Sequence, residues 1–174
     1  TVADLELVLG VIAGPDWRDP SVTAMPLGAS ADVPLSGLRV AMYTAHPGGA
    51  DPDPDMIRGV DRAAAALAEV GARVHRALPP RVEETYAITR AYWRRPESQS
   101  ADEWKPAGVH ATELGPLGAE ESARLLFEWD RFRRAFIGFM EGFDAVLTPA
   151  ANRPALPHGE PDGGIPFTLS YSLT

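Results

Sequence analysis

The stretch EWDRFRRAFIGFMEGFDAVLTP, residues 128–149, decides the fold that this sequence predicts. Its first half carries apolar residues three and four positions apart, which is the spacing of one face of a helix. These residues are Trp129, Phe132, Phe136, Phe139 and Met140. We expect Gly142 to end the helix, because glycine tolerates a positive φ. The apolar run 145–147 that follows has no polar alternation, so it predicts a short strand buried on both faces of a sheet covered by helices.

Two more strands are predicted upstream, at residues 38–43 and 73–78. The helix between them has Asp53 as its N-cap, Pro54 as its first residue and Gly71 as its C-cap. A strand, a helix and a second strand in this order form a βαβ unit, whose strands are parallel and joined right-handedly. The sequence therefore predicts an α/β fold, in which this unit and the buried third strand make a small, partly parallel sheet flanked by helices.

The remaining elements are predicted on either side of these strands. Thr1 and Asp4 indicate a capped helix at the start of the chain, and this helix carries an apolar stripe. A weaker helical pattern covers residues 81–95, and a helix begins again near Ala119. The terminal run PFTLSYSLT, residues 166–174, has the character of a β-strand.

Length and composition limit the classes of function. The chain of 174 residues is long enough for one domain with a core, and we interpret residues 1–174 as a single α/β domain. Its formal net charge of −8 argues against nucleic-acid binding. The absence of cysteine excludes disulfides and thiolate chemistry. No apolar run reaches the roughly 20 residues of a membrane span, and no secretory leader is evident, so we expect a cytoplasmic protein.

Several polar residues are candidate ligands, but simpler interpretations fit them better. The histidines are His46, His75, His110 and His158. Their spacings match no ligand motif, so we expect polar surface residues and no metal site. The acidic cluster Asp51, Asp53 and Asp55 alternates with prolines, which suits helix capping better than a calcium loop.

Two other groups of side chains have both a functional and a structural interpretation. Ser170 and Ser172 lack an accompanying base and a Gly-x-Ser-x-Gly elbow, which favours ordinary strand serines over nucleophiles. The arginines at 131, 133 and 134 suit a solvated helix face that pairs with acids such as Glu128 better than an anion site. The aromatic stripe of residues 129–139 is more typical of a core than of a ligand pocket.

Five stretches of the sequence, taken in order, resemble the amidase signature family, which hydrolyses carboxamides. They are TVADLELVLGVIAGPDWRDPS (1–21), LSGLRVAMY (35–43), DPDPDMIRGVDRAAAALAEVGARV (51–74), FDAVLTPAANRPA (143–155) and FTLSYSLT (167–174). The fourth is similar to a family passage that usually reads close to YDVLLTPT. The family often has an asparagine where this chain has Ser172. The order and spacing of the five stretches hold over nearly the whole chain.

The resemblance implies a particular role for this chain. The family's catalytic groups are a lysine, a serine preceded by a cis peptide bond and a nucleophilic serine, the two serines in a Gly/Ser-rich stretch upstream of the segment that begins here at Thr1. The only lysine here is Lys105, and no Gly-Gly-Ser run is present. A hydroxyl nucleophile needs an adjacent base and an oxyanion hole. We therefore expect a non-catalytic fragment of a larger amidase α/β/α sandwich, without cofactor.

In the family, the region around the third strand approaches the substrate, and ligands of open α/β sheets bind beyond the carboxyl ends of strands. Thr148 and Pro149 are therefore the predicted wall of the substrate pocket. The implied partners are the missing catalytic part and a small carboxamide substrate, with self-association through exposed apolar faces. Two alternatives stay open: a stand-alone module that binds a small ligand at the strand ends, and a hydrolase using Asp, Glu and His.

Overall fold

The computed structural model describes residues 1–15, 22–24, 26–49, 51–94, 116–159 and 166–174. Contacts divide the chain into two compact units, Thr1–Leu35 and Ser36–Thr174, and we describe each by itself. The second unit holds all three strands and the helices that cover them. The residues predicted to form the wall of a site lie in this second unit.

The described residues form a sheet of three parallel strands, in agreement with the small parallel sheet that the sequence predicts. These are β1 (Arg39–Met42), β2 (Arg73–Arg76) and β3 (Ala145–Leu147), in the order β2-β1-β3. The register pairs Val40 with both Val74 and Ala145. The prediction that the third strand is buried on both faces is wrong, because all the residues of β3 are only half-buried. The buried central strand is β1.

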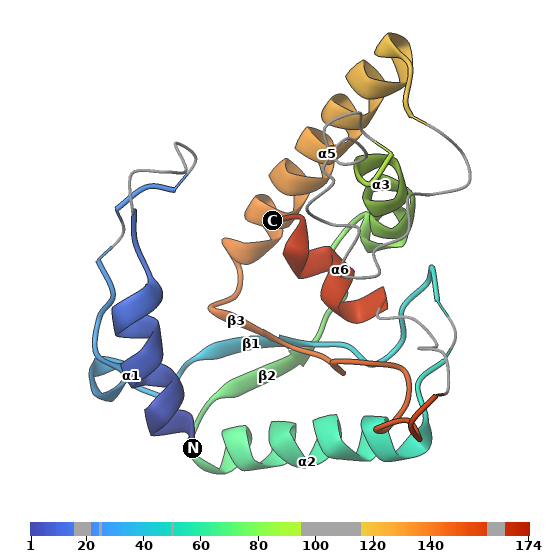
Figure 1. The fold of residues 1–174 in the computed structure, drawn as a ribbon. Helices are drawn as coiled ribbons and strands as arrows, with labels where there is room; N and C mark the ends of the chain where they lie inside the picture. The colour runs from blue at the N-terminus through green and yellow to red at the C-terminus, as the bar shows by residue number, and fades with distance from the viewer. Residues whose placement is uncertain (16–21, 25, 50, 95–115, 160–165) are drawn as a thin grey trace. The chain divides into compact units, whose positions relative to one another are not determined.

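The predicted βαβ unit is confirmed, with helix α2 (Pro54–Glu69) between β1 and β2. The Asp53 carboxylate accepts a hydrogen bond of 2.7 Å from the backbone N–H of Asp55, so Asp53 caps the helix. Gly71, just beyond the end of α2, has a φ of +91°, which an L residue rarely adopts. Figure 1 shows α2 on one side of the sheet and α3, α5 and α6 on the other.

The main core lies among three helices of the second unit. They are α3 (Thr85–Tyr92), which follows the 3-10 turn η2 (Val82–Glu84), α5 (Ala119–Met140) and α6 (Pro166–Ser172). The buried cluster consists of Ile88, Leu117, Leu125, Phe132, Phe136 and Leu173, with Trp129 and Met140 packed against it. The aromatic stripe is therefore core, as predicted.

Two local predictions near the ends of these helices are wrong. Helix α5 ends at Met140, and Gly142 has no positive φ. The last turn closes instead by a bond of 3.2 Å from the N–H of Phe143 to the carbonyl of Met140. The terminal run predicted as a strand is helix α6. The buried residues of the terminal run, Phe167, Ser170 and Leu173, recur every three positions, whereas the side chains of a strand would alternate every two.

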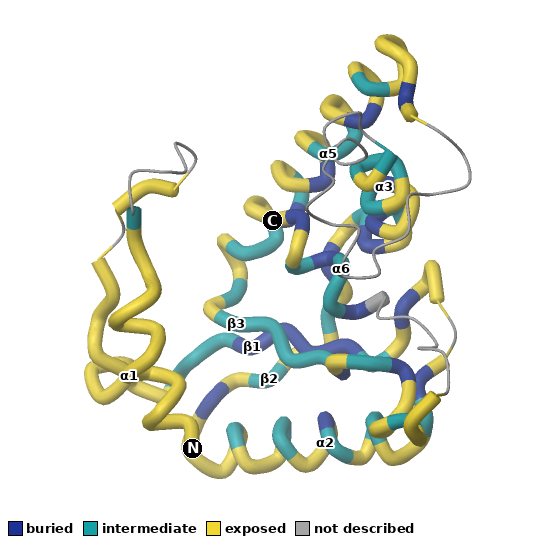
Figure 2. Tube along the Cα trace, in the orientation of Figure 1, coloured by how far each residue is buried: buried dark blue, intermediate teal, exposed yellow. Residues whose placement is uncertain are grey.

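The first unit contains helix α1 (Val2–Ile12) and the 3-10 turn η1 (Ser30–Asp32). The predicted capping box is present, since Thr1 and Asp4 bond reciprocally. The carboxylate of Glu6 accepts bonds of 3.0 and 2.8 Å from the backbone N–H and hydroxyl of Ser30. All residues of α1 are exposed, whereas most of β1 is buried (Figure 2). Within the described residues, we find no helix with the length and hydropathy needed to span a bilayer.

Candidate functional site

The three parallel strands end at the same edge of the sheet, and the segments that leave β1 and β3 run side by side there. The N–H of Tyr43 bonds to the carbonyl of Leu147 at 3.2 Å, and the N–H of Asp53 bonds to the carbonyl of Asn152 at 2.7 Å. Thr148 and Pro149 lie in the second of these segments, directly after β3. Pro149 is fully buried and the hydroxyl of Thr148 is buried, so both residues are part of a packed edge.

A cluster of hydroxyl groups joins this edge to α6 and α3. The phenol oxygens of Tyr43 and Tyr171 are 3.0 Å apart. The hydroxyl of Ser170 donates to that of Thr85 at 3.4 Å, and Thr85 in turn donates to the carbonyl of Val82 at 2.7 Å. The buried Thr148 hydroxyl lowers the pKa of Tyr43, yet it has no hydrogen-bond partner among the described residues. The cluster therefore has one polar group left to pair.

Burial favours the neutral form of both phenols. Burial raises the pKa of Tyr43, and the neighbouring hydroxyls of Tyr171, Thr148 and Ser170 lower it in part. Burial also raises the pKa of Tyr171, and the hydrogen bond with Tyr43 raises it further. Neither phenol can act as an anionic base near neutral pH. The cluster can hold a polar ligand by hydrogen bonds, but it does not activate a nucleophile.

His46 lies three residues beyond Tyr43 and is 4% exposed. Its Nδ1 accepts a hydrogen bond of 3.1 Å from the N–H of Gly48, so the proton of the neutral ring is on Nε2. Burial lowers the pKa of His46, and the charge of Glu83 opposes this shift. The ring packs edge-on against Phe167, with centroids 5.6 Å apart. Among the residues that the structure describes, the buried Nε2 has no hydrogen-bond partner.

The prediction that the histidines are polar surface is wrong for His46. His75 and His158 are exposed, as expected, and His110 lies outside the described residues. Within the residues that the structure describes, no group of three His, Asp or Glu side chains could hold a metal.

Asn152 is the second buried polar residue that sequence reasoning missed at this edge. It is 6% exposed, and its Oδ1 has no hydrogen-bond partner within the described part of the chain. Its backbone carbonyl is occupied by the N–H of Asp53. Asn152 and His46 share one signal in the sequence, since each falls within a few residues of a strand's carboxyl end and precedes a proline closely. That position is where an open α/β sheet exposes its loops to ligands.

The two serines of the terminal run have no catalytic neighbours among the described residues. Ser170 is fully buried in α6, and its hydroxyl bonds to that of Thr85. Ser172 is exposed and donates to the carbonyl of Thr168 at 3.2 Å, one helical turn back. Both are therefore helix serines, not the strand serines expected. Lys105 lies outside the described residues.

Two of the three arginines predicted to pair with acids on this helix, Arg131 and Arg134, do so. Arg131 lies 3.2 Å from Glu128, and Arg134 lies 2.8 Å from Asp130. The Glu128 carboxylate also pairs with Arg81 at 2.8 Å, which ties α5 to the turn before α3. These exposed ion pairs lie on a solvated face of α5, and their role is structural.

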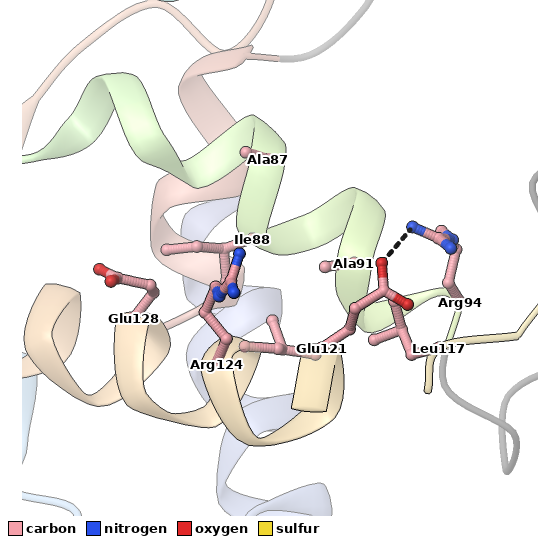
Figure 3. A pocket seen from close by; sticks show the side chains of 9 residues that line it. Ala87, Ile88, Ala91, Arg94, Leu117, Glu121, Arg124 and Glu128 are labelled. Carbon is pink, nitrogen blue, oxygen red and sulfur yellow. Dashed lines mark ion pairs between the residues drawn. The ribbon is translucent and has the colours of Figure 1, made fainter. Parts of the chain in front are cut away.

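A separate hollow of about 210 Å³ lies between α3 and the first turns of α5 (Figure 3). Apolar side chains, among them Ile88, Ala91 and Leu117, form its floor. Arg94 and Glu121 lie at its rim and form an ion pair of 3.8 Å. The residues that line it come from neither the strands nor the segments that follow them, so it is distinct from the strand-end site.

Comparison with known proteins gives a consistent family and fold. The family described as Amidase matches residues 1–103, which is more than half of the chain. A solved structure titled "Fatty acid amide hydrolase" is 19% identical, with a TM-score of 0.71 over 90% of this chain and 30% of that one. A bacterial aryl acylamidase of the amidase signature family is 16% identical, with a TM-score of 0.72 over 100% of this chain and 43% of that one. This chain therefore spans less than half of either protein. None of the curated proteins compared with it matches.

Proposed function

The chain belongs to the amidase family, and we propose that it forms one wall of the substrate pocket in an enzyme that hydrolyses small carboxamides. The observation that carries the proposal is the edge where β1 and β3 end. Neutral hydroxyl and amide side chains are gathered there in buried positions, with Thr148 and Pro149 directly after β3. Such groups bind and orient a neutral polar substrate and carry no charge that would attract an ion.

We propose that the chain does not break the amide bond by itself. Hydrolysis by a hydroxyl nucleophile needs a base within hydrogen-bond reach and donors for the oxyanion. Among the described residues, the buried Ser170 bonds to another hydroxyl, and Ser172 bonds to a helix carbonyl. The catalytic groups then belong to polypeptide outside these 174 residues, which is the expected partner of this chain. A cytoplasmic location stays a prediction.

The exposed apolar surface supports this fragment proposal over a stand-alone binding module. In the part of the chain that the structure describes, β3 is paired on one side only, and the apolar side chains of α1 are exposed. A self-contained module is expected to cover such surface. The hollow between α3 and α5 is the feature that favours the module, because its apolar floor and charged rim are typical of a small-ligand site.

A titration of the isotope-labelled chain with benzamide, followed by NMR, tests the pocket wall. We expect shifts at Thr148 and Tyr43, and none at Asp61 on the exposed face of α2. Thr148→Val keeps the shape of the side chain but removes the hydroxyl, and it should weaken binding by about fivefold, the worth of one hydrogen bond. Shifts confined to the residues between α3 and α5 would support the module. An absence of shifts at the strand ends would refute the pocket wall.

A further inference from the structure

The hollow between α3 and α5 exists because two alanines occupy the side of α3 that borders it. Ala87 and Ala91 are four positions apart, so they lie on the same side of the helix. Both line the hollow, and a larger side chain at either position would take up part of its space. The rest of the apolar floor comes from Ile88, Leu117 and Leu125, which are buried residues of the core.

The volume of the hollow, about 210 Å³, limits the size of a ligand. Pockets for drug-sized molecules begin at roughly 300 Å³, whereas an apolar cavity of about 150 Å³ is large enough to bind benzene. The hollow therefore has room for one apolar ring with one small substituent. The ring would cover the apolar floor, which is favourable because it removes apolar area from water. The substituent would then meet the charged side chains of the rim.

The two carboxylates that line the hollow, Glu121 and Glu128, already have partners on this chain. Besides its ion pair at the rim, Glu121 accepts a hydrogen bond of 3.1 Å from the N–H of Gly118 and so caps α5. Glu128 pairs with Arg81 at 2.8 Å and with Arg131 at 3.2 Å. A cationic ligand would have to compete with these donors, so the rim does not favour a cation.

Arg124, in contrast, has hydrogen-bond donors to spare. Figure 3 shows its side chain extending from α5 towards α3. Among the described residues, its guanidinium donates to the carboxylate of Glu120 at 3.1 Å, and a guanidinium has five N–H donors in all. The side chains of this pair are 69% and 89% exposed, so the pair is weak and does not prevent Arg124 from binding a second carboxylate.

We propose that this hollow binds a small carboxylate that carries one apolar ring. The ring packs on Ala87, Ala91 and Ile88, and the carboxylate pairs with the guanidinium of Arg124, whose planar fork of donors matches the two oxygens. None of these residues belongs to the strand ends. The site is therefore separate from the proposed pocket wall and goes beyond the proposed function.

An NMR titration of the isotope-labelled 174-residue chain with benzoate, benzyl alcohol and benzylammonium tests the site. The three probes share a ring and differ in charge. We expect benzoate to shift the signals of Ala91 and Leu125 and to bind about tenfold more tightly than benzyl alcohol, the worth of one hydrogen bond to a charged group. Benzylammonium should bind no more tightly than the alcohol. Equal affinities of benzoate and benzyl alcohol, or no shift at Ala91 and Leu125, would overturn the inference.

Two arginine variants separate a contact with the ligand from a general effect of charge. Arg124→Gln should lower the affinity for benzoate to that for benzyl alcohol and leave the affinity for the alcohol unchanged. Arg134→Gln is the matched control, because Arg134 lies on the same helix and pairs with an acid four positions earlier but does not line the hollow. It should bind benzoate as the wild type does. An equal loss of affinity in the two variants refutes the proposed contact.

Ala91→Leu tests the position of the ring, because it fills the hollow from the side of α3. This variant should bind neither benzoate nor benzyl alcohol, and wild-type affinity in the folded variant would overturn the inference. If Ala91→Leu fails to fold, the comparison of Arg124→Gln with Arg134→Gln decides the matter, since both arginines are exposed.

The proposed pocket wall is judged separately, by the shifts that benzamide causes at Thr148 and Tyr43. If benzamide shifts these residues and benzoate shifts none in the hollow, the pocket wall stands and this inference falls. If benzoate binds in the hollow and benzamide shifts nothing at the strand ends, this inference stands and the pocket wall falls.

Discussion

The carboxylate of Asp144 joins the first residues of two strands. It accepts hydrogen bonds from the Arg39 side chain at 2.7 and 3.1 Å and from the Arg39 backbone N–H at 2.9 Å. The N–H of Asp144 returns a bond of 2.8 Å to the carbonyl of Arg39. These bonds from Arg39, the side-chain ones foremost, lower the pKa of Asp144 to about 2. One residue therefore anchors the start of β3 on the start of β1.

We predict that this anchor makes stability depend on pH in the acid range. The pKa of Asp144 is lower in the folded chain than the 3.8 of the free group. Its contribution is therefore complete above about pH 4 and is lost as the pH falls towards 2. Asp144→Asn should lower the free energy of unfolding at pH 7 and flatten its decline between pH 4 and 2, as measured by urea denaturation. Parallel pH profiles of the two proteins would contradict this account.

Single residues also show which parts of the candidate site the sequence could indicate. The position of Thr148 and Pro149 at the end of a strand followed from the apolar run before them. The burial of His46 did not, because it depends on Phe167, which lies 121 positions further along the chain and packs on the ring. Asn152 is buried as well, and its carbonyl bonds to the N–H of Asp53, 99 positions earlier in the chain. Loop residues in this sequence carry no periodic pattern that would indicate their burial.

At the scale of elements, the capping residues in the sequence predicted where the helix of the βαβ unit, α2, begins and ends. Asp53 caps the helix and Pro54 is its first residue, as predicted, whereas the C-cap is Val70 and Gly71 follows it with a positive φ. The end of α5 shows the limit of this reasoning, since a 3-10 turn can end a helix without a left-handed glycine at Gly142.

We predict that Gly71→Ala destabilises the protein by more than about 1 kcal/mol. Its φ of +91° is unfavourable for alanine, and an added Cβ would lie 3.0 Å from the Ser36 hydroxyl. Gly59→Ala is the matched control within α2, where nothing lies within 4 Å of an added Cβ. That change should stabilise the protein by about 0.5–1 kcal/mol. Thermal or chemical denaturation measures both, and equal effects would contradict the argument.

The sequence predicts a strand where α6 lies, because a short apolar segment can fit both the helical period of 3.6 residues and the strand period of 2. Phe167, Leu169, Tyr171 and Leu173 alternate with polar residues, which is typical of a strand. Tertiary packing instead favours a helix for this segment. The carbonyl of Leu173 accepts a bond of 2.6 Å from the indole N–H of Trp129, and Phe136 lies 5.9 Å from Tyr171 between ring centroids. Contacts with α5 of this kind are tertiary, so a segment read alone could not predict them.

At the scale of the whole molecule, apolar surface without a cover is the feature that the fragment proposal must explain. On α1, Val2, Val11 and Ile12 are each at least 70% exposed. Burying such residues against another surface is favourable, because it removes apolar area from water. We therefore expect α1 to bind other parts of a larger enzyme, or a second copy when these are missing.

We predict that the purified chain self-associates at micromolar concentration, as measured by sedimentation velocity. Val11→Glu places a charge on the exposed apolar helix and should shift the population towards monomer. Ala123→Glu is the control, because it adds the same charge at an exposed position of α5. A monomeric wild-type chain would argue against the prediction, as would an equal response of the two variants.

The central claim is that these residues support an amide-hydrolysing site whose reactive groups lie elsewhere. The most direct measurement is ammonia release from benzamide and acetamide by the purified chain, alongside the variant Ser170→Ala/Ser172→Ala. The account predicts no release above the buffer rate from either protein. Turnover by the wild-type chain would contradict it, and loss of that turnover in the variant would place the nucleophile in α6.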